Sequence, residues 1–229
     1  MRRDARRRMS WLPVSLRVSL TCTLAACMFA ACSGSEAAPT SPGASARAAI
    51  TTRAQPRTPV HPRVAAARRQ IGVTLLYDPA YVVLPYPGGD VPESRGVCTD
   101  VVIRALRAEG IDLQKTVHED MRAHFDLYPK KWGLRRPDRN IDHRRVPNLQ
   151  TWFARQGWSL TPSQSAAAYK PGDLVTWMLP GNLPHIGIVG DRTSSRDVPL
   201  IIHNIGSGTR EEDILFAYPI TGHYRNRAR

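Results

Sequence analysis

One cysteine and two histidines have the types and the chain order that nucleophilic catalysis requires. Cys98 opens a run with helical apolar spacing, His185 begins a strand-like run, and His203 ends the next one. Free backbone N–H groups and the helix dipole at a helix N-terminus favour a thiolate, so we expect Cys98 to have a depressed pKa. Cys98 would attack a carbonyl carbon, His185 would be its base, and His203 would orient His185. A buried structural thiol is the alternative.

The elements that must position these side chains change from helical to strand-like along the chain. Residues 77–95, rich in Pro, Gly and Tyr, form a predicted loop. Helices that precede strands, with short connections, indicate an α+β domain in which N-terminal helices pack on a C-terminal antiparallel sheet. In such a sheet the start of one strand lies beside the end of the next, which would bring His185 and His203 together. The predicted helices span residues 64–71, 98–109, 113–125 and 146–156, and the predicted strands span 174–178, 185–189, 199–203 and 214–218.

The N-terminus has the pattern of a bacterial export signal. A basic segment over residues 2–8 precedes apolar and small residues from 11 to 31, and short Ala-rich runs lead to Cys27 and Cys32. Either cysteine resembles a lipidation site at which the chain is processed. We therefore predict a lipoprotein-type signal over residues 1–32, with ordinary cleavage or an uncleaved anchor as alternatives. Arg17 argues against the anchor because it interrupts the apolar span.

The next segment and the charge distribution complete the domain organisation. Residues 33–60 are mostly Ala, Ser, Pro, Thr and Gly, which predicts a disordered tether, and residues 61–229 form a single domain. Of the net charge of +13, residues 1–32 carry +5 (six Arg, one Asp) and residues 33–72 carry +5 (six Arg, one Glu). Residues 73–229 carry a net charge of only +3. A folded nucleic-acid binder concentrates charge on its globular part, so we expect no nucleic-acid partner.

Cysteine usage narrows the role of the remaining thiol. Cys22, Cys27 and Cys32 all lie in the export signal, and Cys98 is the one cysteine of the predicted domain. It has no partner for an intradomain disulfide. A free thiol in an oxidising compartment is either buried in the core or serves as a reactive group.

Four short motifs in this order resemble the NlpC-type (p60) group of papain-like cysteine peptidases. They are Val97-Cys98-Thr99-Asp100, Pro171-Gly172-Asp173-Leu174, His185-Ile186-Gly187-Ile188-Val189 and Ile202-His203-Asn204. The resemblance implies a papain-like fold and an exported enzyme that cuts amide bonds in peptidoglycan stem peptides, without a metal or other cofactor. It implies catalytic roles for Cys98, His185 and His203.

A longer resemblance covers residues 71–225. This stretch is similar to a bacterial family of domains of unknown function, family 1287, through the runs 85–91, 117–121, 140–149 and 222–225. Tyr86 precedes the cysteine where related peptidases line their site with a Tyr. Tyr86, Asp100 and Asn204 are the candidate substrate-binding residues. Because Val97 stands where the peptidases have an acidic residue and Thr99-Asp100 replaces Ser-Gly, recognition of a substrate's amino end does not carry over.

The expected partners are the bacterial membrane, through the lipid anchor, and peptidoglycan or another anionic envelope polymer on the periplasmic side. Residues 130–148 carry seven Lys and Arg side chains that suit such a polymer, and a solvated loop is the alternative.

Two other enzyme classes fit the sequence less well. A metallohydrolase would need zinc spacing, which His118, Glu119, Asp120, His143 and His223 do not have. An L,D-transpeptidase has its cysteine after its histidine, and no cysteine follows residue 98. A non-catalytic envelope-binding or scaffold lipoprotein on the same fold remains the alternative to a hydrolase.

Overall fold

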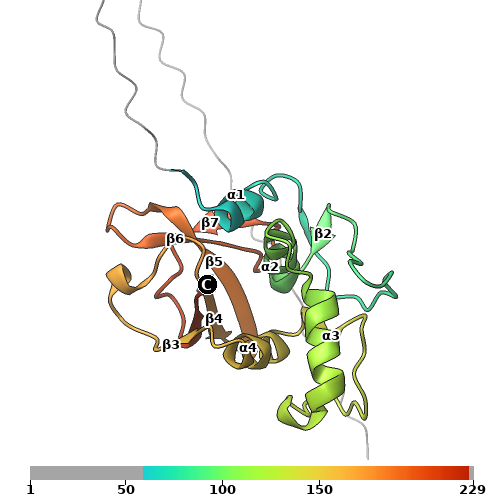
Figure 1. The fold of residues 1–229 in the computed structure, drawn as a ribbon. Helices are drawn as coiled ribbons and strands as arrows, with labels where there is room; N and C mark the ends of the chain where they lie inside the picture. The colour runs from blue at the N-terminus through green and yellow to red at the C-terminus, as the bar shows by residue number, and fades with distance from the viewer. Residues whose placement is uncertain (1–58, 227–229) are drawn as a thin grey trace, which may run out of the picture. The chain divides into compact units, whose positions relative to one another are not determined.

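The structure, a computed structural model, describes residues 59–226, which belong to one compact unit. The predicted signal with Cys27 and Cys32, and the predicted tether up to residue 58, lie outside the described residues. No helix within residues 59–226 is long and apolar enough to cross a membrane. The described residues form an α+β arrangement with the helices first and an antiparallel sheet later, as the sequence predicted (Figure 1).

All four predicted helices are present, and their ends differ from the prediction by a few residues. The helices are α1 (Pro62–Arg68), α2 (Cys98–Arg107), α3 (Leu113–His124) and α4 (Val146–Arg155), with 3-10 turns η1 (Phe125–Leu127), η2 (Asp142–Arg144) and η3 (Ala166–Ala168). The strands are β1 (Leu76–Tyr77), β2 (Arg95–Gly96), β3 (Ser159–Leu160), β4 (Leu174–Leu179), β5 (Leu183–Thr193), β6 (Pro199–His203), β7 (Arg210–Glu212) and β8 (Ile220–Tyr224).

The main sheet has six antiparallel strands in the order β3-β8-β4-β5-β6-β7. In its centre, Ile188 of β5 lies opposite Ile202 of β6. At the edge, His203 of β6 lies opposite Arg210 of β7. A separate short pair joins β1 and β2 in parallel, with Tyr77 opposite Gly96. This register brings the predicted loop back to the residues that precede Cys98.

The prediction of a strand over residues 214–218 is wrong. These residues form a turn that connects β7 to β8, and both of those strands belong to the main sheet. The segment is apolar because it covers the sheet: Leu215 is fully buried in a cluster with Trp177, whose indole N–H donates to the Leu215 carbonyl at 2.9 Å. Apolar side chains that cover a sheet face and those that alternate along a strand look alike in a short run.

Both faces of the sheet are covered, and for that reason its central strands are almost continuously apolar. Leu174 and Ile188 pack on one face against the helices. Val175 and Val189, their immediate neighbours, pack on the other face with Trp177.

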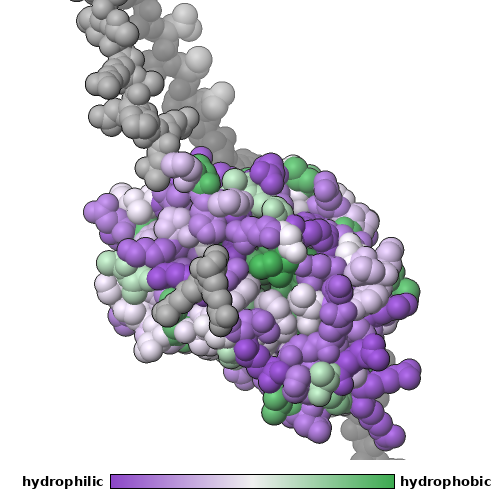
Figure 2. Space-filling view, in the orientation of Figure 1, coloured by the Kyte–Doolittle hydropathy of each residue, from purple (hydrophilic) through white to green (hydrophobic). Residues whose placement is uncertain are grey.

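Helix α2 is the element that joins the helical layer to the sheet. It packs against α1, α3 and β5, and lies on the side of the sheet that the helices cover (Figure 1). Val101, Val102 and Leu106 have no exposed surface. The face shown in Figure 2 is mostly hydrophilic, with hydrophobic residues in small separate groups. The first residue of α2, Cys98, is therefore held by a rigid core element.

Candidate active site

Cys98 is the first residue of α2, as the sequence predicted, and its side chain lies against strand β5. The Asp100 carboxylate accepts a hydrogen bond from the Val97 N–H at 2.6 Å, which stabilises the start of the helix. The thiol is free and only 4% exposed. The backbone N–H of Ile186, the residue after His185, lies near the sulfur and favours its thiolate form. Cys98 therefore contacts β5 through Ile186, in the cluster on the helix side of the sheet, whereas the His185 ring packs against Trp177, 5.9 Å between ring centroids, on the other face.

The expected low pKa of this thiol is wrong for the structure as it stands. Burial raises the pKa of Cys98 to about 12, and the Asp100 charge adds to the rise. The nearby backbone N–H groups of Ile186, Thr99 and Cys98 favour the thiolate but do not offset the burial. Burial, with a smaller contribution from His203, lowers the pKa of His185 to about 3. Burial therefore favours the neutral form of both the thiol and the imidazole.

The two histidines are joined as expected, and an unexpected carboxylate extends the chain. Nε2 of His185 lies 3.1 Å from Nδ1 of His203. Nε2 of His203 lies 3.0 Å from Oε2 of Glu212 on β7. His185 is 2% exposed and His203 is fully buried, whereas the Glu212 side chain is 37% exposed. The result is a line of three groups, His185–His203–Glu212, that runs from the protein interior to the surface.

This line fixes the tautomer of each ring. A carboxylate can only accept, so His203 carries its proton on Nε2 and donates it to Glu212. Neutral His203 then accepts at Nδ1, which requires His185 to donate from Nε2. His185 is left with a free lone pair on Nδ1. That atom is the one able to take a proton from a nucleophile.

Gly187 allows β5 and β6 to approach each other at this point. A Cβ built on Gly187 would lie 2.6 Å from Cγ2 of Ile201 and 3.1 Å from Cβ of His203. Any larger residue would push His203 away from His185. The glycine of the His185-Ile186-Gly187 motif therefore serves the histidine contact.

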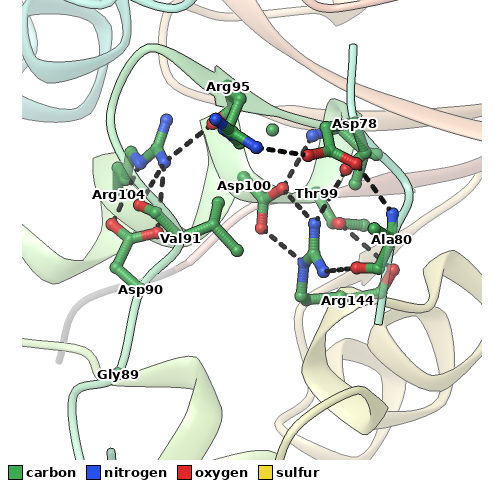
Figure 3. A network of polar contacts seen from close by, with 12 residues as sticks. Asp78, Ala80, Gly89, Asp90, Val91, Arg95, Thr99, Asp100, Arg104 and Arg144 are labelled. Atoms are coloured by element: carbon green, nitrogen blue, oxygen red, sulfur yellow. Dashed lines mark hydrogen bonds and ion pairs between the residues drawn. The ribbon is translucent and has the colours of Figure 1, made fainter. Parts of the chain in front are cut away.

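Asp100, a candidate substrate-binding residue, is a structural residue instead. Its carboxylate forms two 2.9 Å hydrogen bonds with the Arg144 guanidinium, and both side chains are almost fully buried. The same guanidinium donates to the carbonyls of Ala80 and Asp78, at 3.0 Å and 3.3 Å (Figure 3). Arg144 thus joins the start of α2 to the loop of residues 78–80, and Asp100 has no oxygen left for a ligand.

Asn204, another candidate, also supports the site from within. It is fully buried, and its side-chain N–H donates to the Gly96 carbonyl at 3.0 Å, while its Oδ1 accepts from Gly206 N–H. This bond links the end of β6, directly after His203, to the residues that precede Cys98. Asn204 therefore fixes the nucleophile segment relative to the histidines.

The tyrosine beside Cys98 is Tyr77 rather than Tyr86. Tyr86 packs edge-on against His118 with ring centroids 5.4 Å apart, beneath the Arg139 guanidinium at 5.6 Å. Tyr77 lines a groove of about 200 Å³ together with Cys98. Burial and the neighbouring Cys98 and Asp100 raise the pKa of Tyr77 to about 12. The pairing of Tyr77 with Gly96 places it there, and sequence spacing carries no signal for that pairing.

Comparison with known protein families shows to which family the chain belongs. The model described as Domain of unknown function (DUF1287) matches residues 64–226. The chain belongs to the DUF1287 family. A relative from Escherichia coli (strain K12), "Uncharacterized protein YijF", is 60% identical over 159 residues, which cover 69% of this chain and 78% of the relative. The predicted family is thereby confirmed, and the matched residues include Cys98, both histidines and Glu212.

The Pro171-Gly172-Asp173 turn has a structural role in this DUF1287 domain. Asp173 accepts from Nε2 of His223 at 2.7 Å and forms two 2.6 Å hydrogen bonds with Arg225. These bonds hold the pKa of Asp173 below its usual value despite its burial. The turn and the end of β8 are thus fixed together, and His223 is used for this contact.

The residues considered for a metal do not form a metal site in the DUF1287 domain. Asp120 accepts from Tyr128 at 2.5 Å and from Arg155, and His143 is buried with its pKa lowered to about 3 by burial. Within residues 59–226, no group of three or more His, Cys, Asp or Glu side chains could hold a metal ion.

Proposed function

We propose that the protein is an exported cell-envelope cysteine hydrolase that cuts an amide bond, in peptidoglycan stem peptides, on a papain-like fold of the NlpC type. The observation that carries this proposal is the His185–His203–Glu212 line, which begins on the strand that packs against Cys98 at the start of α2. A base of fixed tautomer and a free thiol are the two groups that acyl transfer through a thioester requires. The order of helix, strand and strand supports the peptidase-like fold.

The proposed reaction uses the side chains in an ordered way. The His185 ring, which packs against Trp177 in the structure, would have to turn towards the sulfur, and the Cys98 proton would then move to its Nδ1 as the sulfur attacks the amide carbonyl carbon. N–H groups at the start of α2 would stabilise the oxyanion. His185 then gives its proton to the leaving amine as the C–N bond breaks, which leaves a thioester. Water, deprotonated by His185, hydrolyses the thioester to a carboxylic acid and restores the thiol.

Because burial favours the neutral form of both groups, we propose that the proton moves during the attack rather than before it. The positive charge that forms on His185 would be stabilised by His203, which is held by the Glu212 carboxylate. In this proposal Cys98, His185 and His203 have the roles predicted from the sequence, and Glu212 and Tyr77 are added to them.

A basic groove supports an anionic envelope polymer as the partner. Arg122 of α3 and Arg136 and Arg139 of the following segment line a groove of about 670 Å³, and within residues 59–226 none of the three is paired with a carboxylate. Three unpaired guanidinium groups on one surface attract phosphate or carboxylate groups. Hydrophilic residues gather over this end of the molecule in Figure 2. We propose that the anchored protein holds the polymer here on the periplasmic side of the membrane.

Two experiments test these roles. The purified protein should release peptide fragments from isolated peptidoglycan, read by mass spectrometry, and Cys98→Ala and His185→Ala should abolish the release. Release by Cys98→Ala would refute the cysteine mechanism. Replacing Arg122, Arg136 and Arg139 with Gln should weaken sedimentation with peptidoglycan, and replacing the exposed Lys115, Lys131 and Arg135 should not.

One observation favours a non-catalytic scaffold as the second candidate. The thiol is 4% exposed and its pKa is raised to about 12, as for an inert core cysteine. A scaffold would bind peptidoglycan equally well with Cys98 replaced by Ala and would release no fragments.

A further inference from the structure

The groove beside Cys98 has an unusual balance of charge. Its walls are largely apolar and include Pro79, Ile141, Val146 and Pro184. Two arginines, Arg144 and Arg145, line it, and none of its lining residues is acidic. The two arginines are adjacent in sequence, but their guanidinium groups differ in how many hydrogen bonds they form.

Arg144 is already paired. Its guanidinium makes two hydrogen bonds to Asp100 and two to backbone carbonyls, which uses four of its five N–H donors. Its charge is balanced by the Asp100 carboxylate.

Arg145 is buried without comparable partners. Its side chain is 17% exposed and lies 4.1 Å from the centroid of the Trp132 ring. Its Nη1 is buried and has no hydrogen-bond partner, so a ligand in the groove would bind the guanidinium through Nε or Nη2, which form no hydrogen bond within residues 59–226. The nearest carboxylate oxygen, Oδ1 of Asp142, is 3.8 Å away, beyond hydrogen-bond distance, and that oxygen has no partner either.

A guanidinium in such a place requires an acceptor. Planar N–H donors match the two oxygens of a carboxylate, and stacking on an aromatic ring fixes the plane in which they point. Desolvation already disfavours the charge on Arg145 and lowers its pKa. An anion that enters the groove would restore the lost interaction.

We propose that Arg145 binds a carboxylate of the substrate in this groove. The proposed hydrolase would then select amides that carry a free carboxylate close to the bond that Cys98 attacks, and would discriminate against the same amides with that carboxylate neutralised. This inference rests on the proposed function for its biological meaning. The binding itself depends only on the groove.

The first test compares two reagents for the same thiol. Iodoacetate and iodoacetamide differ in a carboxylate, so the ratio of their rates at Cys98 reports the local positive charge. The reaction is followed at pH 9 to 10 by mass spectrometry of the peptide that contains Cys98, since other cysteines are present in the chain. We expect Arg145→Gln to lower the ratio about tenfold, which corresponds to a single charge a few ångströms away.

Matched variants separate this effect from changes in folding or net charge. Arg135→Gln removes an exposed arginine that does not line the groove, and the ratio should stay unchanged. Arg145→Lys keeps the charge and should retain most of the ratio. An equal ratio in the wild type and Arg145→Gln would overturn the inference.

A second measurement does not depend on thiol reactivity. Cys98→Ala protein is titrated calorimetrically with N-acetyl-glycyl-glycine and with its C-terminal amide. Tighter binding of the free acid, lost in the Cys98→Ala/Arg145→Gln double variant, supports the inference, and equal binding of both peptides refutes it. Carboxylate-selective binding without fragment release from peptidoglycan would refute the hydrolase alone. Fragment release with no carboxylate preference in either assay would refute the role of Arg145 alone.

Discussion

Nε2 of His185 lies 3.1 Å from Nδ1 of His203, and the two rings are nearly perpendicular, at 87°. Because His203 is held on its far side by Glu212, the contact has a direction, from His185 through His203 to the carboxylate. It makes Nδ1 of His185 the basic atom of the site.

The direction of this line predicts graded losses of activity. His203→Ala should lower kcat/KM for fragment release by about 100-fold, because His185 loses its orientation and its stabilising neighbour. Glu212→Gln should cost less, about tenfold, since it acts through His203 and is partly exposed. Glu119→Gln, which removes the charge of an exposed carboxylate outside the site, is the control for lost charge. Equal activity of His203→Ala and the wild type would contradict the proposed roles.

The burial of Cys98 predicts how its reactivity depends on pH. With a pKa of about 12, the rate of alkylation of the native protein should still be rising at pH 10. The same peptide in urea should level off near the ordinary thiol pKa of about 8.5. A plateau in the native protein at or below pH 8 would instead indicate a thiolate stabilised by His185.

The buried ion pair between Asp100 and Arg144 predicts a large loss of stability when one partner is replaced. Arg144→Gln leaves the Asp100 carboxylate buried without its partner, which should lower the free energy of unfolding by about 3–5 kcal/mol. Asp100→Asn combined with Arg144→Gln should recover part of this loss because no charge remains buried. Urea denaturation measures both, and the exposed Arg135→Gln should change stability by no more than about 0.5 kcal/mol. A double variant less stable than Arg144→Gln would contradict the explanation.

Buried neutral histidines predict acid sensitivity. Burial lowers the pKa of both His143 and His185 to about 3, so below about pH 6.5 the unfolded chain binds protons that the folded state does not. Each histidine therefore costs up to about 1.4 kcal/mol per pH unit as the pH falls toward 3.

One carboxylate acts in the opposite direction. Burial raises the pKa of Asp142 to about 6, so the folded state takes up its proton first between about pH 6 and 4 and gains stability there. The net expected loss from pH 6.5 to 4 is about 2–4 kcal/mol by urea denaturation. His143→Leu should reduce this slope, and a slope unchanged in that variant would contradict the assignment.

Local patterns in the sequence were enough for the helices, for three of the four predicted strands and for the order of the catalytic candidates. Cys98 opens α2 because apolar spacing begins there, and His185 and His203 meet because adjacent antiparallel strands must align their ends. The family match is likewise a property of the sequence.

What tertiary structure alone decided is which polar groups are used up and which are free. Residues far apart in sequence determine this. Arg144 is hydrogen-bonded to Asp100, Asn204 to Gly96, and His203 to Glu212. The sequence carried no signal for Tyr77 or Glu212, since each reaches the site through strand pairing. It also predicted the wrong direction for the Cys98 pKa, because a helix N-terminus is a local feature, whereas burial depends on everything packed around the sulfur.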